Sequence, residues 1–209
     1  MSDFKFRTDS YPPVVKYLII SNVLVFIAQQ LFDSQYNLTA LLALYPITTP
    51  EFRPYQIITH MFTHSPNRIF HILFNMVSLW MFGKILENLW GAKRFLNFYL
   101  LCGIGAAIFH LLIQHYTGNY SAAIGASGAV MGIFIAFGYL FPNTELFLMF
   151  IPIPIKAKWV VMGLIAYDLF GGVANSSSDN VAHFAHLGGA ITGFIIVLIW
   201  NKKNRQRFY

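Results

Sequence analysis

The chain has 209 residues, of which 56% are hydrophobic and only 11% are charged, and its formal net charge is +6. Soluble domains usually carry about 25% charged residues, so this composition excludes an ordinary water-soluble domain. The hydrophobic residues gather instead in runs that are long enough, or nearly so, to cross a hydrocarbon core of about 30 Å. The sequence therefore predicts a membrane protein.

Six apolar runs follow one another along the chain, and we expect each of them to form a transmembrane helix. Their ranges are 17–32, 69–89, 95–115, 125–141, 159–174 and 181–200. They predict an all-α membrane protein, a six-transmembrane-helix bundle that forms a single domain over residues 1–209. Residues 1–16 and 201–209 are expected to be cytoplasmic tails. The polar tail has no small-residue cleavage site after the first run, which favours a retained anchor over a signal peptide.

The basic residues are divided unevenly between the two sides of this arrangement. With both termini in the cytoplasm, 12 of the 14 Lys and Arg residues lie in inner segments, and only Arg53 and Arg68 lie outside. This asymmetry is the one that sets the orientation of membrane proteins. The positive charge therefore indicates topology and contact with membrane lipid, and not nucleic-acid binding. With no targeting segment evident, we expect a bacterial plasma (inner) membrane.

The connections between the runs differ in character. Residues 33–68 mix apolar patches with four prolines, so we expect a long interfacial loop between the first two helices. Residues 141–158 are expected to form a proline-stiffened inner loop, and the polar segment NSSSDN (175–180) a mobile loop on the outer side. Cys102 is the only cysteine, which excludes a disulfide framework and a cysteine-based metal site.

Four polar residues converge at one depth of the expected bundle. The second, fourth and sixth helices all run from outside to inside, and each carries polar residues near its outer end. At about 1.5 Å per residue, His71, Asn75, Ser127 and His186 all lie within roughly 10 Å of the outer boundary. A polar side chain within a membrane needs a partner or a purpose, so this layer is the first candidate for a functional site.

Small residues give a reason for two of these helices to touch. The fourth helix carries Gly128, Gly132 and Ala136 at intervals of four residues, and the sixth helix carries Ala185, Gly189 and Gly193 in the same way. Such stripes allow membrane helices to approach closely. Because Ser127 and His186 stand next to the starts of these stripes, a close parallel pairing would bring them within hydrogen-bond reach.

A serine beside a neutral imidazole is an arrangement suited to acyl transfer, since the imidazole takes the hydroxyl proton. The negative charge that then develops on the substrate oxygen needs donors. His71 and Asn75 lie at i and i+4, hence on one helix face, and can provide two. The backbone N–H of Ser127 at the start of a helix can provide a third.

The motifs GASG, HILFN and AHLGGAITG, taken together, resemble those of the rhomboid intramembrane serine proteases over essentially the whole chain. The resemblance implies a six-helix core and a Ser–His dyad that cleaves peptide bonds in or near transmembrane segments, without a metal or another cofactor. It implies that Ser127 is the nucleophile, that His186 is the general base and acid, and that His71 and Asn75 bind the oxyanion. Transmembrane protein substrates are the implied partners, and the oligomeric state stays open.

His183 is a rival for the role of base, but only His186 fits the family's spacing to Gly189 and Gly193. The sequence departs from the family's pattern at two places. Tyr55 and Gln56 stand where Trp and Arg are common, so the anchoring of the loop is expected to differ. Met131 stands where an aromatic residue often supports the catalytic imidazole, although a thioether also makes favourable contacts with rings.

Simpler interpretations stand beside these. The GASG stripe is compatible with helix packing alone, and His110 and His115 are expected to be structural. His60 and His64 are spaced as a metal pair can be, but the absence of an HExxH motif favours a structural role in the loop. Asp168, an acid within the fifth run, is expected either to hydrogen-bond within the bundle, which we favour, or to assist His186 electrostatically.

The sequence thus predicts an intramembrane serine endopeptidase. The first alternative is a non-catalytic rhomboid-like protein that binds transmembrane segments, whose signature would be loss of the serine or the histidine. The second is a transporter or a metal-dependent membrane hydrolase, for which more buried carboxylates or broken helices would be expected.

Overall fold

The computed structural model describes residues 12–118, 121–148, 151–173 and 180–205, and these residues are mostly helical. Predictions were also made for two segments that lie outside the described residues. These are residues 1–11 of the N-terminal tail and residues 175–179 of the polar segment NSSSDN. The elements, in chain order, are α1 (Pro13–Tyr36), α2 (Leu38–Leu42), α3 (Gln56–Thr59), η1 (His60–Phe62), α4 (Ile69–Ser78), η2 (Leu79–Gly83), α5 (Lys84–Trp90), α6 (Ala92–Thr117), α7 (Ser127–Leu140), β1 (Glu145–Leu148), β2 (Ile151–Lys156), α8 (Ala157–Val173) and α9 (Asn180–Arg205).

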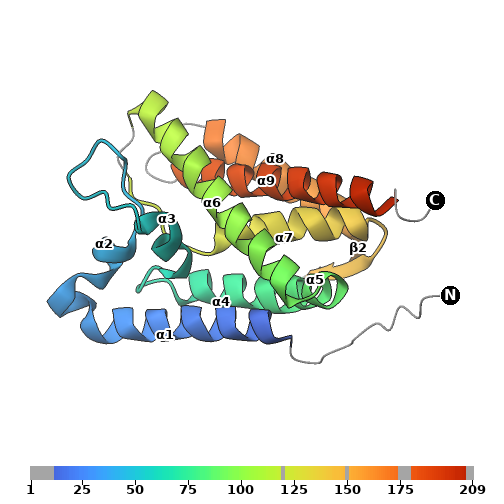
Figure 1. Cartoon of the computed structure of the whole chain (residues 1–209), viewed down its shortest axis with the longest axis horizontal. Coiled ribbons are helices and arrows are strands. Elements are labelled where there is room, and N and C mark those ends of the chain that lie inside the picture. Colours follow the sequence, from blue (N-terminus) through green and yellow to red (C-terminus); the bar gives the residue numbers. More distant parts are fainter. Residues whose placement is uncertain (1–11, 119–120, 149–150, 174–179, 206–209) are drawn as a thin grey trace.

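The long helices lie roughly side by side, with α1 and α4 along one flank and α8 and α9 along the other, while α6 crosses between them (Figure 1). The start of α1, the turn between α5 and α6, the strands and the end of α9 gather at one end of the bundle. The short helices α2 and α3 lie at the opposite end. This arrangement agrees with the alternating direction of the predicted helices.

Four helices are long and apolar enough to cross a membrane by length and composition: Pro13–Tyr36, Ile69–Trp90, Ala92–Thr117 and His183–Lys202. The protein is a multi-pass membrane protein. The expected fourth run is shorter than predicted, because α7 begins only at Ser127 and ends at Leu140, which leaves 14 residues. The expected fifth helix, α8, has 17 residues.

The second helix is not a uniform α-helix. Its middle, η2 (Leu79–Gly83), is a π-helical segment between α4 and α5. An ideal Cβ atom at Gly83 would lie 3.0–3.2 Å from side chains of Leu79, Phe95 and Val15, so η2 packs closely against both α6 and α1. Such π segments are rare in soluble and membrane helices and locally widen the helix.

The start of α1 is fixed by a buried acid from α5. The carboxylate of Glu87 accepts hydrogen bonds from the backbone N–H groups of Val14 (2.9 Å) and Val15 (2.7 Å). The first N–H groups of a helix have no acceptor within the helix, and an anion is favourable there. Glu87 is 2% exposed. This geometry gives Glu87 a structural role at the start of α1.

The interfacial loop is held by two buried glutamines. Gln29 of α1 donates to the backbone carbonyl of His64 (2.8 Å) and accepts from the backbone N–H of His64 (3.1 Å). Gln56 donates to the carbonyl of Glu51 (3.0 Å) and accepts from the backbone N–H of Arg53 (3.0 Å). The loop is thus packed against the bundle, as its sequence predicts.

The connection from α7 to α8 contains two antiparallel strands, which the sequence analysis did not predict. Glu145 pairs with Lys156 and Leu146 with Ile155 across β1 and β2. Pro152 and Pro154 lie in β2, where the missing N–H groups usually argue against a strand. A two-stranded sheet tolerates them because each of its strands has an unpaired edge.

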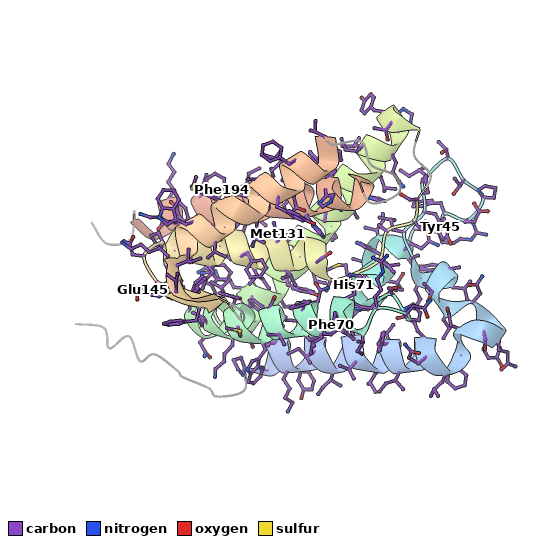
Figure 2. All side chains as sticks on the ribbon, turned by 180° about the vertical axis from the view of Figure 1, so that it is seen from behind. Tyr45, Phe70, His71, Met131, Glu145 and Phe194 are labelled. Atoms are coloured by element: carbon purple, nitrogen blue, oxygen red, sulfur yellow. The ribbon has the colours of Figure 1, made fainter. Side chains whose placement is uncertain are left out.

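The outside of the bundle is apolar, as expected for a protein surrounded by lipid tails. Phe70 on α4 is 64% exposed and Phe194 on α9 is 43% exposed (Figure 2). At the end where the strands lie, three basic groups stand over tryptophan rings: Lys84 over Trp80, Arg94 over Trp200 and Lys158 over Trp159, at 5.1–5.5 Å. Tryptophan and basic residues together are typical of a membrane–water interface.

Candidate active site

Ser127 is the first residue of α7, and the segment before it is fixed by the interfacial loop. Ala123 and Leu44 exchange two backbone hydrogen bonds of 2.9 Å, and the N–H of Gly125 donates to the carbonyl of His60 at 2.9 Å. Gly125 has a φ of 120°, a conformation that residues with a side chain rarely adopt. This glycine turns the extended segment into the helix and thereby fixes the position of the hydroxyl of Ser127.

The backbones of α7 and α9 are in direct contact at the predicted small-residue stripes. An ideal Cβ atom at Gly193 would lie 2.8 Å from the Cα atom of Gly132, and one at Gly189 would clash with the carbonyl of Gly128. The two contacts advance by four residues on both helices, so the helices run parallel. The close pairing predicted from the stripes is confirmed.

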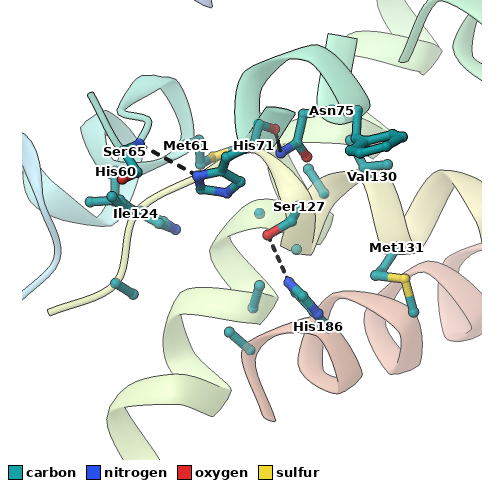
Figure 3. Close-up of a pocket in the computed structure, with 18 of the residues that line it drawn as sticks. His60, Met61, Ser65, His71, Asn75, Ile124, Ser127, Val130, Met131 and His186 are labelled. Atoms are coloured by element: carbon teal, nitrogen blue, oxygen red, sulfur yellow. Dashed lines mark hydrogen bonds between the residues drawn. The ribbon is translucent and has the colours of Figure 1, made fainter. Parts of the chain in front are cut away.

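This pairing brings together the two side chains that the sequence analysis singled out. The Nε2 atom of His186 lies 2.8 Å from the Oγ atom of Ser127 (Figure 3). The other ring nitrogen of His186, Nδ1, lies 3.0 Å from the Oδ1 atom of Asp168 on α8. The side chain of His186 is 26% exposed, and that of Asp168 is 4% exposed.

His71 and Asn75 lie on the facing side of the same cavity. The backbone N–H of Ser65 donates to Nδ1 of His71 at 3.4 Å, so the hydrogen of a neutral imidazole lies on Nε2. That Nε2 atom would lie 2.9 Å from an ideal Cβ atom at Gly125, and the hydroxyl of Ser127 would lie 3.5 Å from the same point. An oxygen atom placed in this space would have Nε2 of His71 and the hydroxyl of Ser127 as neighbours.

The side chain of Asn75 is oriented by its own helix. Its Nδ2 atom donates to the carbonyl of His71 at 2.7 Å, and the residue is 6% exposed. An amide nitrogen carries two hydrogens, so one remains for another acceptor. Figure 3 shows Asn75 above Ser127, on the same side of the cavity as His71.

The cavity around these residues has a volume of about 990 Å³. Ser127, His186, His71, Asn75 and Asp168 all line it. Ligand cavities of about this volume accept drug-sized or peptide-sized groups. The four polar residues that the sequence analysis singled out therefore line one cavity, while their common depth in the membrane stays a prediction.

Asp168 and His183 form the part of the site that sequence reasoning left open. The Nδ1 atom of His183 lies 2.8 Å from the same Oδ1 atom of Asp168 that His186 contacts. His183 and His186 are three residues apart, which places them on one face of α9. The ring of Tyr167 packs edge-on against His183 at 5.4 Å, a contact for which the sequence carried no clear signal.

Within the described residues, one group offers three side-chain ligands to a metal ion, namely Asp168, His183 and His186, whose ligand atoms lie within 4.8 Å of one another. Their distances of 2.8 and 3.0 Å are those of hydrogen bonds. His60 and His64, the other candidate pair, are buried in the loop, and Nδ1 of His60 bonds to the carbonyl of Gln56 at 2.8 Å. This contact supports the structural role.

Comparison with known proteins identifies the family of the chain. The family described as "Rhomboid domain" matches residues 51–203. The chain belongs to the rhomboid family, and it is a rhomboid membrane protein with apolar helices.

Curated relatives are about 30% identical to the chain over the aligned residues. Rhomboid protein 1, mitochondrial, of Saccharomyces cerevisiae is 31% identical over 72% of this chain and 44% of its own length. RHOMBOID-like protein 12, mitochondrial, of Arabidopsis thaliana is 29% identical over 93% and 60%. Presenilin-associated rhomboid-like protein, mitochondrial, of Homo sapiens is 30% identical over 90% and 49%. The chain thus spans about half the length of these relatives.

The names of these relatives place them in mitochondria. They do not support the bacterial plasma membrane that the sequence analysis expected.

Proposed function

We propose that this protein is an intramembrane serine endopeptidase that cleaves peptide bonds in or near the transmembrane segments of other membrane proteins. The observation that carries the proposal is the 2.8 Å contact between the Ser127 hydroxyl and Nε2 of His186 inside a cavity within the bundle. Membership of the rhomboid family supports it. Ser127 is the nucleophile in this proposal, and His186 is the general base and acid.

The reaction proceeds by acyl transfer. Oγ of Ser127 attacks the carbonyl carbon of the substrate while Nε2 of His186 takes the hydroxyl proton. His186 then gives this proton to the leaving nitrogen, and the peptide C–N bond breaks. A water molecule attacks the resulting ester by the same route and restores the hydroxyl of Ser127.

The oxyanion is bound by His71, by Asn75 and by the start of α7. Nε2 of His71 faces the space beside Gly125, and Asn75 contributes its second amide hydrogen. The first N–H groups of α7 have no acceptor within the helix, so the N–H of Ser127 can also donate. Removal of one oxyanion donor typically lowers the rate about 10²–10³-fold in serine proteases.

The six predicted spans belong to the same proposal, with α7 and α8 as shorter crossings inside one domain of residues 1–209 and with both termini in the cytoplasm. Because α7 has only 14 residues, Ser127 at its outer end lies below the level reached by its longer neighbours. The site then needs an opening to water on the outer side, and transmembrane protein substrates reach it from the surrounding lipid.

The test uses purified protein in detergent and a serine-reactive fluorophosphonate. We expect labelling of the wild-type protein and its loss in Ser127→Ala and in His186→Ala, while circular dichroism shows that both variants stay folded. A matched control is Ser34→Ala, which changes an exposed serine far from the cavity and should label as the wild type does. Labelling that persists in Ser127→Ala would move the nucleophile to another residue.

A non-catalytic rhomboid-like protein that binds transmembrane segments is the competing function. In that case the cavity would accept a segment, but the hydroxyl of Ser127 would not react. An unlabelled wild-type protein that still binds a fluorescent single-span peptide would favour this alternative.

A further inference from the structure

The acid within the bundle, Asp168, is held in a way that bears on the chemistry of His186. α8 has 17 residues, and among them only Ala157, Val161 and Asp168 are buried. Asp168 is therefore a polar side chain turned inward from a helix whose remaining residues are partly or fully exposed. An ionisable group at membrane depth is costly unless it is paired, and Asp168 is paired with two imidazoles.

The two contacts of Asp168 determine which nitrogen of His186 carries the hydrogen. An ionised carboxylate only accepts hydrogen bonds, so the Nδ1 atoms at 2.8 Å (His183) and 3.0 Å (His186) must both donate. In a neutral His186 the other nitrogen, Nε2, then has its lone pair exposed. That lone pair faces the hydroxyl of Ser127 at 2.8 Å, which is the direction a general base requires.

We propose that Asp168 is a positioning residue that fixes the tautomer and the orientation of His186, so that the dyad works as a Ser127–His186–Asp168 triad. This inference rests on the proposed function. This positioning also compensates for the departure from the family's pattern at residue 131, where an aromatic residue often supports the catalytic imidazole. Met131 is instead buried in an apolar cluster with Ile135, Val161 and Ala190. The carboxylate from α8 supplies the support through its contact with Nδ1 of the ring.

His183 has a distinct place in this arrangement. It holds the carboxylate from a second direction, while the edge of the Tyr167 ring packs against it at 5.4 Å. An ideal Cβ atom at Gly171 would lie 2.5–2.7 Å from the ring of His183, so the imidazole fits closely against the α8 backbone. His183 thereby fastens α8 to α9 and keeps Asp168 in place when His186 changes its charge.

During the reaction the proton from Ser127 arrives on Nε2, and His186 becomes an imidazolium with a hydrogen on each nitrogen. The hydrogen on Nδ1 stays there, since Asp168 stays ionised and stabilises the positive charge. When the leaving nitrogen takes the proton from Nε2, His186 returns to its first tautomer. The proton from Ser127 thus leaves with the amine product, and a proton from the attacking water later restores the hydroxyl of Ser127; no electron is transferred.

The test compares Asp168→Asn with Asp33→Asn, because Asp33 is a carboxylate that accepts from the backbone N–H of Thr39 in the interfacial loop. Saturating fluorophosphonate labelling separates kinact from KI. For Asp168→Asn we expect kinact to fall at least about tenfold with KI within about twofold of the wild-type value. The acid limb of the pH profile of kinact should move to lower pH, since the imidazolium loses its anionic partner. Asp33→Asn should match the wild type.

A second measurement does not depend on the folding of Asp168→Asn. Nitrogen-15 spectra of histidine-labelled wild-type protein report the tautomer of each imidazole, and His186→Gln assigns the signal. We expect His186 to carry its hydrogen on Nδ1 at pH 8; a hydrogen on Nε2 would overturn the proposal. Unchanged kinact and an unchanged pH profile in folded Asp168→Asn would also overturn it, and the serine protease assignment would stand. A wild-type protein that does not label, or labels independently of Ser127, contradicts the proposed function itself.

Discussion

Gln56 shows how one side chain can replace the anchor that the family commonly has at this place in the loop. It is 1% exposed, and besides its bonds to Arg53 and Glu51 it lies 3.4 Å from the backbone N–H of Tyr45 and from the carbonyl of Leu41. An amide with two donors and a carbonyl oxygen satisfies all four groups. In this chain the loop is therefore anchored at this place by the amide of Gln56.

Replacing Gln56 should therefore loosen the interfacial loop. In Gln56→Leu the backbone groups that it serves lose their partners inside the protein, and we expect the free energy of unfolding to fall by about 1–3 kcal/mol. Thermal unfolding in detergent, followed by tryptophan fluorescence, measures this change. The neighbour Tyr55 is 48% exposed, and Tyr55→Phe is the matched control that should unfold like the wild type. Equal melting temperatures for the wild type and Gln56→Leu would show that the loop does not depend on this residue.

His64 makes the stability of the loop depend on pH. It is fully buried, neither ring nitrogen has a hydrogen-bond partner among the described residues, and burial lowers its pKa from 6.5 to about 4. Burial also lowers the pKa of His60 to about 4. The unfolded chain therefore binds more protons than the folded one between pH 6.5 and 4. Stability is full above this window and is lost as the pH falls through it, by on the order of 2–3 kcal/mol for each histidine.

This pH dependence can be measured as the melting temperature between pH 7.5 and 4.5. We expect His64→Phe to lose less stability on acidification than the wild type, because the phenyl ring fills the site without taking up a proton. His115 is exposed, so His115→Gln should keep the wild-type slope. A slope in His64→Phe equal to that of the wild type would remove this residue as a cause.

At the scale of elements, the contact between α7 and α9 sets the distance between Ser127 and His186. A Cβ atom at Gly189 would meet the backbone of Gly128, which cannot move aside as a flexible side chain can. Gly189→Ala should therefore push the helices apart and weaken the contact between Ser127 and His186. We expect the rate of fluorophosphonate labelling to fall at least about tenfold, since misplacement by about 1 Å can cost 10²-fold in rate.

The control for this prediction is Gly163→Ala on α8. No atom lies within 4 Å of an ideal Cβ there, and alanine favours a helix more than glycine does. This variant should label at the wild-type rate. Similar rates for Gly189→Ala and the wild type would show that the backbone contact does not control the geometry of the site.

The sequence predicted the elements unevenly, for physical reasons. Long apolar runs and small-residue stripes depend on local composition, so α1, α6, α9 and the α7–α9 contact followed from them. The strands β1 and β2 were missed because Pro152 and Pro154 interrupt the signal of a strand. The shared carboxylate of Asp168 could only be offered as one of two roles, since its partners lie on another helix and no local pattern reports their distance.

At the scale of the whole molecule, the basic residues and the tryptophans mark one end of the bundle. We expect this end, which carries the strands, to face the cytoplasm and the interfacial loop to face outward. In a Cys102→Ala background, Ser34→Cys should react with a membrane-impermeant maleimide on intact spheroplasts of a bacterial expression host. Asn143→Cys should react only after the membrane is opened. Both positions are exposed, whereas Cys102 is buried.

The two cysteine variants control for each other, because both should label fully in detergent. Reaction of both from the same face would contradict the alternation of the spans, and a reversed pattern would contradict the orientation. The multi-pass membrane class was the most predictable level of the structure, since it follows from summed hydrophobicity and not from the exact position of any one side chain, while the orientation stays a prediction.

The position of Asp168 on a third helix, α8, has a practical consequence for inhibitors. Ser127 and His186 stand on helices whose backbones touch, while Asp168 stands on the helix with three buried residues. A compound wedged beneath α8 would separate the carboxylate from the imidazole and leave the hydroxyl unoccupied. Under the proposed mechanism, such a compound would slow turnover without competing for Ser127, so a screen limited to serine-directed warheads would overlook it.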